Sequence, residues 1–199
     1  IPHDDDPDRA VRAAIAMVRR LWEWNVERQA AGQLIVDMGI GINTDSVVSG
    51  NIGSPRRMDY TVIGDGVNLA SRLESACKTY SARILISETT AAALRGIYRM
   101  RDVDVVVVKG RSTPVRIFEV LDYHTPTTFP NLVDVVNYFG EGMRHYRDAD
   151  WNRAAGRFAR CLELHPGDGL SATYVERCRS LLADPPGGDW NGTWVMREK

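Results

Sequence analysis

The 199-residue sequence has few cysteines, no long apolar run and almost no excess charge. Its three cysteines, Cys77, Cys161 and Cys178, are an odd number without the spacing of a zinc site, which argues against a disulfide framework and indicates a reducing compartment. No run approaches the roughly 18 apolar residues of a membrane span. The first ten residues also lack the basic region and apolar core of a signal peptide. We therefore expect a soluble, cytoplasmic chain without membrane contact.

The formal net charge of −1 offers no basic field for nucleic acid. The length suits one domain with a substantial core, or one domain with a small appendage. We expect no nucleic acid partner, and binding that depends on particular side chains rather than on bulk charge.

Residues 1–122 alternate between helical and strand patterns. A long helix is expected up to Gly32, with Asp6 as a candidate cap and Pro7 in its first turn. Residues 34–53 predict two strands, whose glycines mark turns or a close approach of the backbone. A third strand is expected to end near Ile63.

The next segments predict a helix from about Gly66 to Thr79, with Asp65 as its cap. A short buried strand, "ARILISE", and a short helix capped by Ser87 or Thr89 follow. The segment around the turn "KGRSTP" then predicts a β-hairpin. This order of elements indicates a mixed fold of helices and strands.

A change of composition divides the chain into residues 1–122, a linker at 123–130 and a helical extension at 131–199. Three helices are expected in the extension, at about 132–148, 151–164 and 169–183. Gly142, Ala154, Phe158 and Pro166 have a spacing that resembles a tetratricopeptide helix-turn-helix, although any two amphipathic helices with alanines at their contact have a similar pattern. Trp190 and Trp194 are expected to dock on the body, with a frayed tail as the alternative.

The stretch "DYTVIGDGVNLASRLE" joins a strand to a helix through glycines. It lacks the third glycine of a dinucleotide fingerprint and the Gly-Lys-Ser/Thr of a P-loop. Asn68 and Arg72 are four residues apart and share one helix face, where arginine can stabilise phosphate charge and asparagine can orient a sugar. Thr61 has one donor and two acceptor lone pairs for the edge of a purine. Alone, Asn68 and Arg72 would more often belong to a solvated helix face, and Thr61 would more often be an ordinary strand threonine.

The longer run "GNIGSPRRMDYTVIGDGVNLASRLE" resembles the core signature of bacterial class III adenylate and guanylate cyclases. The resemblance extends over about the first 122 residues and includes "VKGRSTPVRIFEV". It implies an α+β, ferredoxin-like class III cyclase fold, here followed by a small all-α extension. It also implies a homodimer, or a complementary cyclase subunit, with composite sites in which a ribose 3′-hydroxyl attacks the α-phosphate and releases pyrophosphate.

By this resemblance, Asn68 would orient the ribose and Arg72 would stabilise transition-state charge on the phosphates. Thr61 would select the purine, and a threonine there favours ATP over GTP. Lys109 or Arg111 is a weaker candidate for holding the terminal phosphates.

The family's two metal-binding aspartates, which hold Mg²⁺ or Mn²⁺, are expected upstream of this chain, together with strands of its sheet. Asp4, Asp5 and Asp6 precede a proline and suit a helix cap and solvated charge better than a metal site. We therefore expect the later part of a longer adenylate cyclase, inactive alone. The alternatives are a guanylate cyclase, or a non-catalytic regulatory or interaction module derived from a cyclase.

Overall fold

The computed structural model describes residues 3–54, 57–106, 114–187, 190 and 192. Along the chain the elements are α1 (Asp6–Ala30), β1 (Ile40–Ile42), β2 (Val48–Ser54), β3 (Arg57–Ile63), α2 (Asp65–Tyr80), β4 (Ile84–Ser87), α3 (Glu88–Ala93), β5 (Met100–Val106), β6 (Val115–Val120), α4 (Leu132–Arg147), α5 (Trp151–Leu164) and α6 (Gly169–Ala183). Mixed helices and strands followed by helices alone confirm the α+β prediction.

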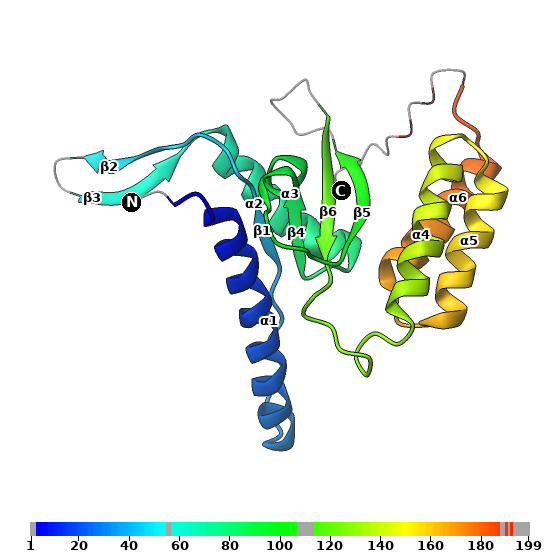
Figure 1. The fold of residues 1–199 in the computed structure, drawn as a ribbon, viewed down its shortest axis with the longest axis horizontal. Coiled ribbons are helices and arrows are strands. Elements are labelled where there is room, and N and C mark those ends of the chain that lie inside the picture. The colour runs from blue at the N-terminus through cyan, green and yellow to red at the C-terminus, as the bar shows by residue number, and fades with distance from the viewer. Residues whose placement is uncertain (1–2, 55–56, 107–113, 188–189, 191, 193–199) are drawn as a thin grey trace.

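Four strands form the central sheet in the order β1-β4-β6-β5 (Figure 1). β1 and β4 are parallel, whereas β6 is antiparallel to both of its neighbours. β5 and β6 are the expected antiparallel pair, with a register shift between Asp102 and Asp104. β1 lies at an edge of the sheet and has one paired neighbour among the described residues.

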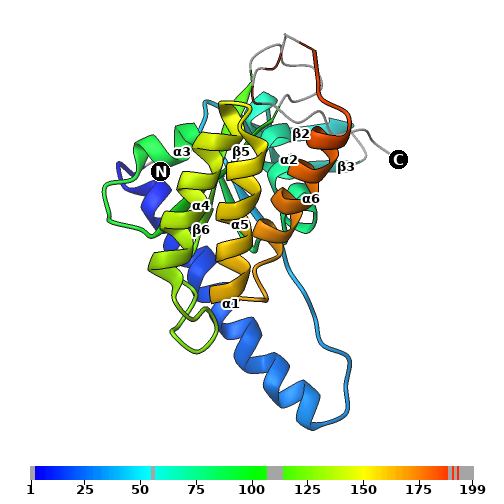
Figure 2. The same cartoon turned by 90° about the vertical axis from the view of Figure 1, so that its right-hand side faces the viewer.

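Helices cover both faces of this sheet and produce two hydrophobic cores. Because successive strand residues point to opposite faces, Ile84 and Ile86 of β4 enter one core and Leu85 the other. α1 packs on the face of Ile84 and Ile86. α2 and the C-terminal helices share the second core, in which Leu85 belongs to the same cluster as Phe139 and Tyr174. The C-terminal helices are therefore packed onto the sheet domain, beside β5 (Figure 2).

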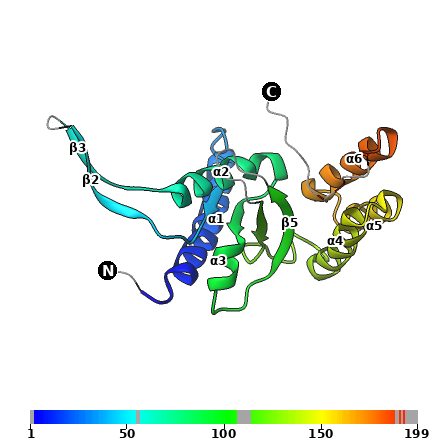
Figure 3. The same cartoon turned by 90° about the horizontal axis from the view of Figure 1, so that it is seen from above.

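β2 and β3 form a separate antiparallel pair that projects from the body, on the side opposite to α4–α6 (Figure 3). Their register aligns Gly50 with Thr61. Large apolar side chains are exposed along both strands, namely Val48, Met58, Tyr60, Val62 and Ile63. Both strands of this ribbon therefore expose apolar surface to solvent.

Two helix starts differ from the sequence predictions. Asp5, not Asp6, is the residue before α1. Asp6 is the first helical residue, and its carboxylate accepts a hydrogen bond from the amide of His3 (2.8 Å), which precedes the helix. α2 begins at Asp65, and the preceding cap position is Gly64. The cap of α3 is confirmed as Ser87, whose Oγ accepts a hydrogen bond from the Thr90 amide (3.2 Å).

Candidate functional site

The joint between β3 and α2 is a single-residue turn at Gly64. This glycine has φ 148° and ψ 166°, a backbone conformation that residues with a side chain rarely adopt. Its carbonyl accepts hydrogen bonds from the amides of Val67 (3.1 Å) and Asn68 (3.3 Å). The helix therefore starts directly after the strand, with only Gly64 between them.

α2 divides into a buried face and an exposed face. The buried residues are Gly66, Leu69, Leu73, Ala76, Cys77 and Tyr80. Asn68 and Arg72 are exposed and lie one turn apart, as the sequence predicted. Thr61, two residues before the end of β3, is also exposed. Within the part of the chain that the structure describes, these three side chains make no hydrogen bond or ion pair, so their polar groups are available to a ligand.

Two glycines of the segment before β2 let α2 lie directly on the sheet. A Cβ added to Gly41 would come within 2.2 Å of the Ala70 carbonyl oxygen and 2.3 Å of the Glu74 amide nitrogen. A Cβ added to Gly39 would come within 2.8 Å of the Cys77 Cβ. The sequence prediction that glycines here mark a close approach of the backbone is confirmed, and the partner is the helix that carries Asn68 and Arg72.

Asn43 holds the first turn of α2, and the sequence reading missed it. Its Nδ2 donates to the Gly66 carbonyl (3.1 Å), while its Oδ1 accepts from the Ser87 hydroxyl (2.7 Å) and the Thr89 hydroxyl (3.0 Å). A Cβ at Gly66 would meet Asp45 Cβ at 2.6 Å, so the turn is also tightly enclosed. The available signal was an asparagine directly after the strand "GIGI", a position suited to a side chain that pairs with backbone groups.

The acidic residues at the start of the chain are engaged with arginines. Asp4, Asp5 and Asp6 each pair with an arginine, respectively Arg95 (3.5 Å), Arg12 (3.3 Å) and Arg9 (3.4 Å). Among the residues with described positions, no group of three or more His, Cys, Asp or Glu side chains is arranged to hold an ion. Lys109 and Arg111, the candidates for the terminal phosphates, lie outside the described residues.

The cysteines are all buried, free thiols. Burial raises the pKa of Cys77 and Cys161 to about 11 and that of Cys178 to about 12. Thiols with such pKa values stay protonated near neutral pH, so these three residues lack the thiolate that nucleophilic chemistry requires.

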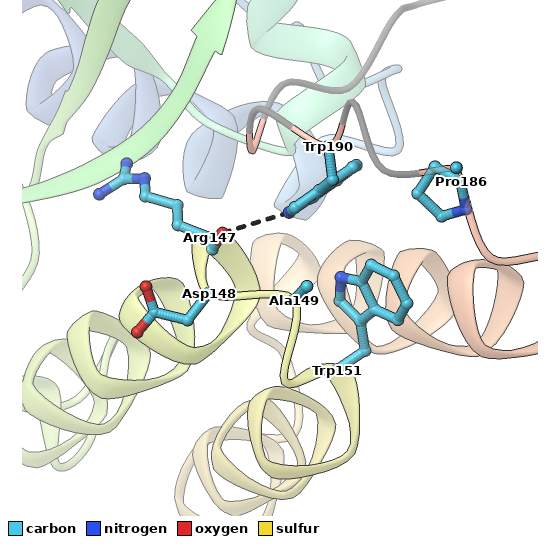
Figure 4. A pocket seen from close by; sticks show the side chains of 7 residues that line it. Arg147, Asp148, Ala149, Trp151, Pro186 and Trp190 are labelled. Atoms are coloured by element: carbon cyan, nitrogen blue, oxygen red, sulfur yellow. Dashed lines mark hydrogen bonds between the residues drawn. The ribbon is translucent and has the colours of Figure 1, made fainter.

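Two cavities lie away from this joint. One, of about 470 Å³, is in the helical extension and is lined by residues that include Arg147, Trp151 and Trp190 (Figure 4). Trp190 docks there as expected, and its Nε1 donates to the Arg147 carbonyl (3.2 Å); Trp194 lies outside the described residues. The other, of about 420 Å³, lies between the sheet and the extension near Arg101 and His124. Neither cavity is lined by Thr61, Asn68 or Arg72.

A search of protein families matches residues 3–122 to the adenylate and guanylate cyclase catalytic domain. The chain belongs to this family. The α+β arrangement is accordingly the ferredoxin-like class III cyclase fold. Two solved structures of similar sequence agree: the adenylyl cyclase CyaB from P. aeruginosa (40% identity, TM-score 0.55, 61% of each chain covered) and a guanylyl cyclase (40% identity, TM-score 0.51, 59% of each chain covered).

Curated relatives of the cyclase domain are much longer than this chain. A Dictyostelium discoideum protein named "Adenylate cyclase, terminal-differentiation specific" is 36% identical over 172 residues, which are 85% of this chain and 8% of that protein. An Anabaena cylindrica adenylate cyclase is 40% identical over 124 residues, 59% of this chain and 25% of that protein. Residues 3–122 make up less than two thirds of the chain, so the Dictyostelium match must also include part of the helical extension.

No helix among the described residues is long and apolar enough to cross a membrane.

Proposed function

We propose that this chain provides the purine-selecting and transition-state half of an adenylate cyclase site, which converts ATP to 3′,5′-cyclic AMP and pyrophosphate. The observation that carries the proposal is the pair of exposed side chains Asn68 and Arg72, one turn apart on α2 of a cyclase family domain and without a hydrogen bond or ion pair to any described residue. In this role Asn68 orients the ribose, and the Arg72 guanidinium stabilises negative charge that grows on the phosphate oxygens. Thr61 reads the purine edge.

The proposal assigns the other half of the site to a second chain. Asn68 and Arg72 lie on an exposed helix face, which suits a site closed by a partner. The exposed apolar ribbon of β2 and β3 offers a contact surface for a homodimer or a complementary cyclase subunit. Following the resemblance, the proposal gives the two carboxylates that bind Mg²⁺ or Mn²⁺ to residues outside this chain, and we expect the chain alone to be inactive.

Adenylate cyclase is preferred over guanylate cyclase because Thr61 stands at the purine-selecting position and several relatives are named as adenylate cyclases. The similarity of a solved guanylyl cyclase shows that overall identity alone does not separate the two nucleotides. Competition between ATP and GTP at the same site would separate them.

For the helical extension we propose a tetratricopeptide-like origin. Its support is the close contact of Gly142 with Phe158, where an added Cβ would lie 2.6 Å from the ring, and the full burial of Ala154 in α5. A deletion of residues 131–199 tests what this unit does: loss of stability without loss of a protein partner supports packing on the cyclase domain.

The test of the proposed activity is complementation. Cyclic AMP would be measured with ATP and Mn²⁺ for the chain alone, and for the chain mixed with a cyclase subunit that keeps its metal-binding carboxylates but lacks its own transition-state arginine. We expect activity only in the mixture, and a reduction of about 10²–10³-fold for Arg72→Ala. Lys78→Ala, another exposed cation on α2, is the matched control. Equal activity of Arg72→Ala and Lys78→Ala would refute the role of Arg72.

A further inference from the structure

The last turn of α2 is joined to the helical extension through one buried carboxylate. Asp104 of β5 accepts at its Oδ2 a hydrogen bond from the Tyr80 hydroxyl (2.7 Å) and another from Arg177 Nη1 (2.6 Å). The three residues come from α2, β5 and α6, and their exposed fractions are 0%, 1% and 5%. One carboxylate oxygen of Asp104 therefore links the end of α2 to α6 of the helical extension.

The electrostatics of this triad keep its hydrogen bonds in place near neutral pH. Burial raises the pKa of Tyr80 and the neighbouring Asp104 raises it further, so the phenol remains a donor. Burial would lower the pKa of Arg177, but Tyr174 and Asp104 raise it above its usual value, so the guanidinium remains charged. Removing one partner from such a buried, charged hydrogen bond is strongly destabilising. This restricts α2 and α6 to positions that keep the bond intact.

Packing at Ser81, the residue after Tyr80, also restricts how α2 and α6 can lie. A Cβ added to Gly169, the first residue of α6, would lie 2.6 Å from both Cβ and Oγ of Ser81. Ser81 ends α2 in the left-handed conformation, with φ 53° and ψ 30°. The start of α6 thus touches the end of α2 with no room for a methyl group.

Fixing the last turn of α2 also fixes the position of the candidate catalytic pair, Asn68 and Arg72, on the same helix. Tyr80 is eight residues from Arg72, about 12 Å along a rigid helix with a rise of 1.5 Å per residue. The start of the helix is held by Asn43 and its middle by Gly41. With the last turn also fixed, the exposed face that carries Asn68 and Arg72 has little freedom to rotate or slide.

We infer that Tyr80, Asp104 and Arg177 are positioning residues for catalysis, and that the helical extension is part of the catalytic body through its hold on α2. This inference rests on the proposed function for the role of Asn68 and Arg72. It differs from a peptide-binding role of the extension, since the extension acts on its own chain.

The test compares two tyrosines that each lose one buried hydroxyl. Tyr80→Phe removes the hydrogen bond between α2 and Asp104. Tyr174→Phe removes the hydrogen bond from α6 to the Val103 carbonyl (2.5 Å), which anchors the extension to β5 without involving α2. Both rings are fully buried, and phenylalanine preserves their packing.

Two readouts are measured on the intact chain and its complemented mixture. Amide hydrogen exchange in the last turn of α2 should become about tenfold faster in Tyr80→Phe, in line with the loss of a hydrogen bond to a charged group, and should stay unchanged in Tyr174→Phe. In the mixture, Tyr80→Phe should lower kcat about three- to tenfold with KM for ATP unchanged, because the reacting groups are misplaced while nucleotide contacts remain.

Equal effects of the two variants, or unchanged exchange in α2 of Tyr80→Phe, would overturn the inference, because both would indicate general stabilisation only. If Tyr80→Phe unfolds the chain, Gly169→Ala is the second variant, because it disturbs the contact of α6 with the end of α2 and leaves every buried charge paired; the same pattern is expected in α2. A mixture in which the unaltered chain makes no cyclic AMP would instead contradict the proposed function. The exchange comparison would then still decide whether the extension holds α2.

Discussion

At its start helix α2 presents Asn68 and Arg72 to solvent, whereas at its end Tyr80 is fully buried between β5 and α6. At the buried end, the Tyr80 hydroxyl and the Arg177 guanidinium both donate hydrogen bonds to Asp104. The polar groups at the exposed end have no partner among the described residues. One helix therefore combines a fixed end, where polar contacts set its position, with an open end, where polar groups are left for a ligand.

Breaking the fixed end should have the largest effect on folding. Arg177→Met leaves Asp104 buried without its cation, and we expect the free energy of unfolding to fall by about 3–5 kcal/mol. Urea unfolding measures this loss. Arg179→Met on the same helix is the control, because its pair with Glu176 is exposed, and its effect should stay within about 0.5 kcal/mol. A similar loss in both variants would show that the buried pair of Arg177 and Asp104 contributes no more stability than an exposed pair.

The close packing of α2 against the sheet can be tested at Gly41. Gly41→Ala places a methyl group against the Ala70 and Glu74 backbone, which cannot move away as a side-chain tip could. We expect a loss of about 1–3 kcal/mol, measured by thermal unfolding. Gly156→Ala in α5 is the control, since its Cβ would enter open space and helix propensity predicts a gain of about 0.5–1 kcal/mol. Equal stability of the unaltered chain and Gly41→Ala would contradict the close approach.

The contact between α6 and α2 allows a rescue experiment. Gly169→Ala should cost about 1–2 kcal/mol, because its methyl group would overlap Ser81. Ser81→Gly removes those atoms and also relieves the left-handed conformation, so it should be stabilising alone by about 0.5–1 kcal/mol. In the double variant the cost of Gly169→Ala should disappear, and a double-mutant cycle of unfolding free energies measures this coupling. Additive effects would mean that the two residues do not meet.

Much of this comparison could be predicted from sequence, because it depends on local spacing. The helix bounds, and the shared exposed face of Asn68 and Arg72, followed from periodicity along α2. The triad could not be predicted, since Tyr80 and Arg177 are 24 and 73 residues away from Asp104 in the chain. Periodicity assigns Asp104 to a strand but says nothing of which distant helix will bring a cation to it. For Asn43 the position after a strand signalled a contact with backbone groups, but not which ones, because its partners Gly66 and Ser87 are 23 and 44 residues away.

A smaller effect is expected from protonation at the junction between sheet and extension. The His124 ring lies tilted against Tyr123 and edge-on to Phe129, with ring centroids at 4.3 Å and 4.9 Å. Burial, followed by the charge of Arg101, lowers its pKa from 6.5 to about 4. The unfolded chain therefore binds a proton between about pH 6.5 and 4 that the folded chain does not, so stability falls as pH decreases through this window.

The contribution of His124 is isolated by substitution. Because the ring is partly exposed, we expect it to account for about 1 kcal/mol of that loss. His124→Gln should flatten the pH dependence of the unfolding free energy between these values, as measured by urea titrations at several pH values. Parallel curves for the variant and the unaltered chain would exclude His124 as the titrating group.

The open end of α2 should be the least sensitive of all to substitution. Asn68→Ala and Arg72→Ala should change the free energy of unfolding by less than about 0.5 kcal/mol, since both side chains are exposed and alanine favours the helix. Leu69→Ala and Leu73→Ala, their neighbours on the buried face, should each cost about 2–5 kcal/mol. The same urea titrations measure all four variants. If Asn68→Ala or Arg72→Ala were as destabilising as the leucine variants, the pair would be holding the fold rather than facing a ligand, and loss of cyclic AMP production in these variants could no longer be assigned to catalysis.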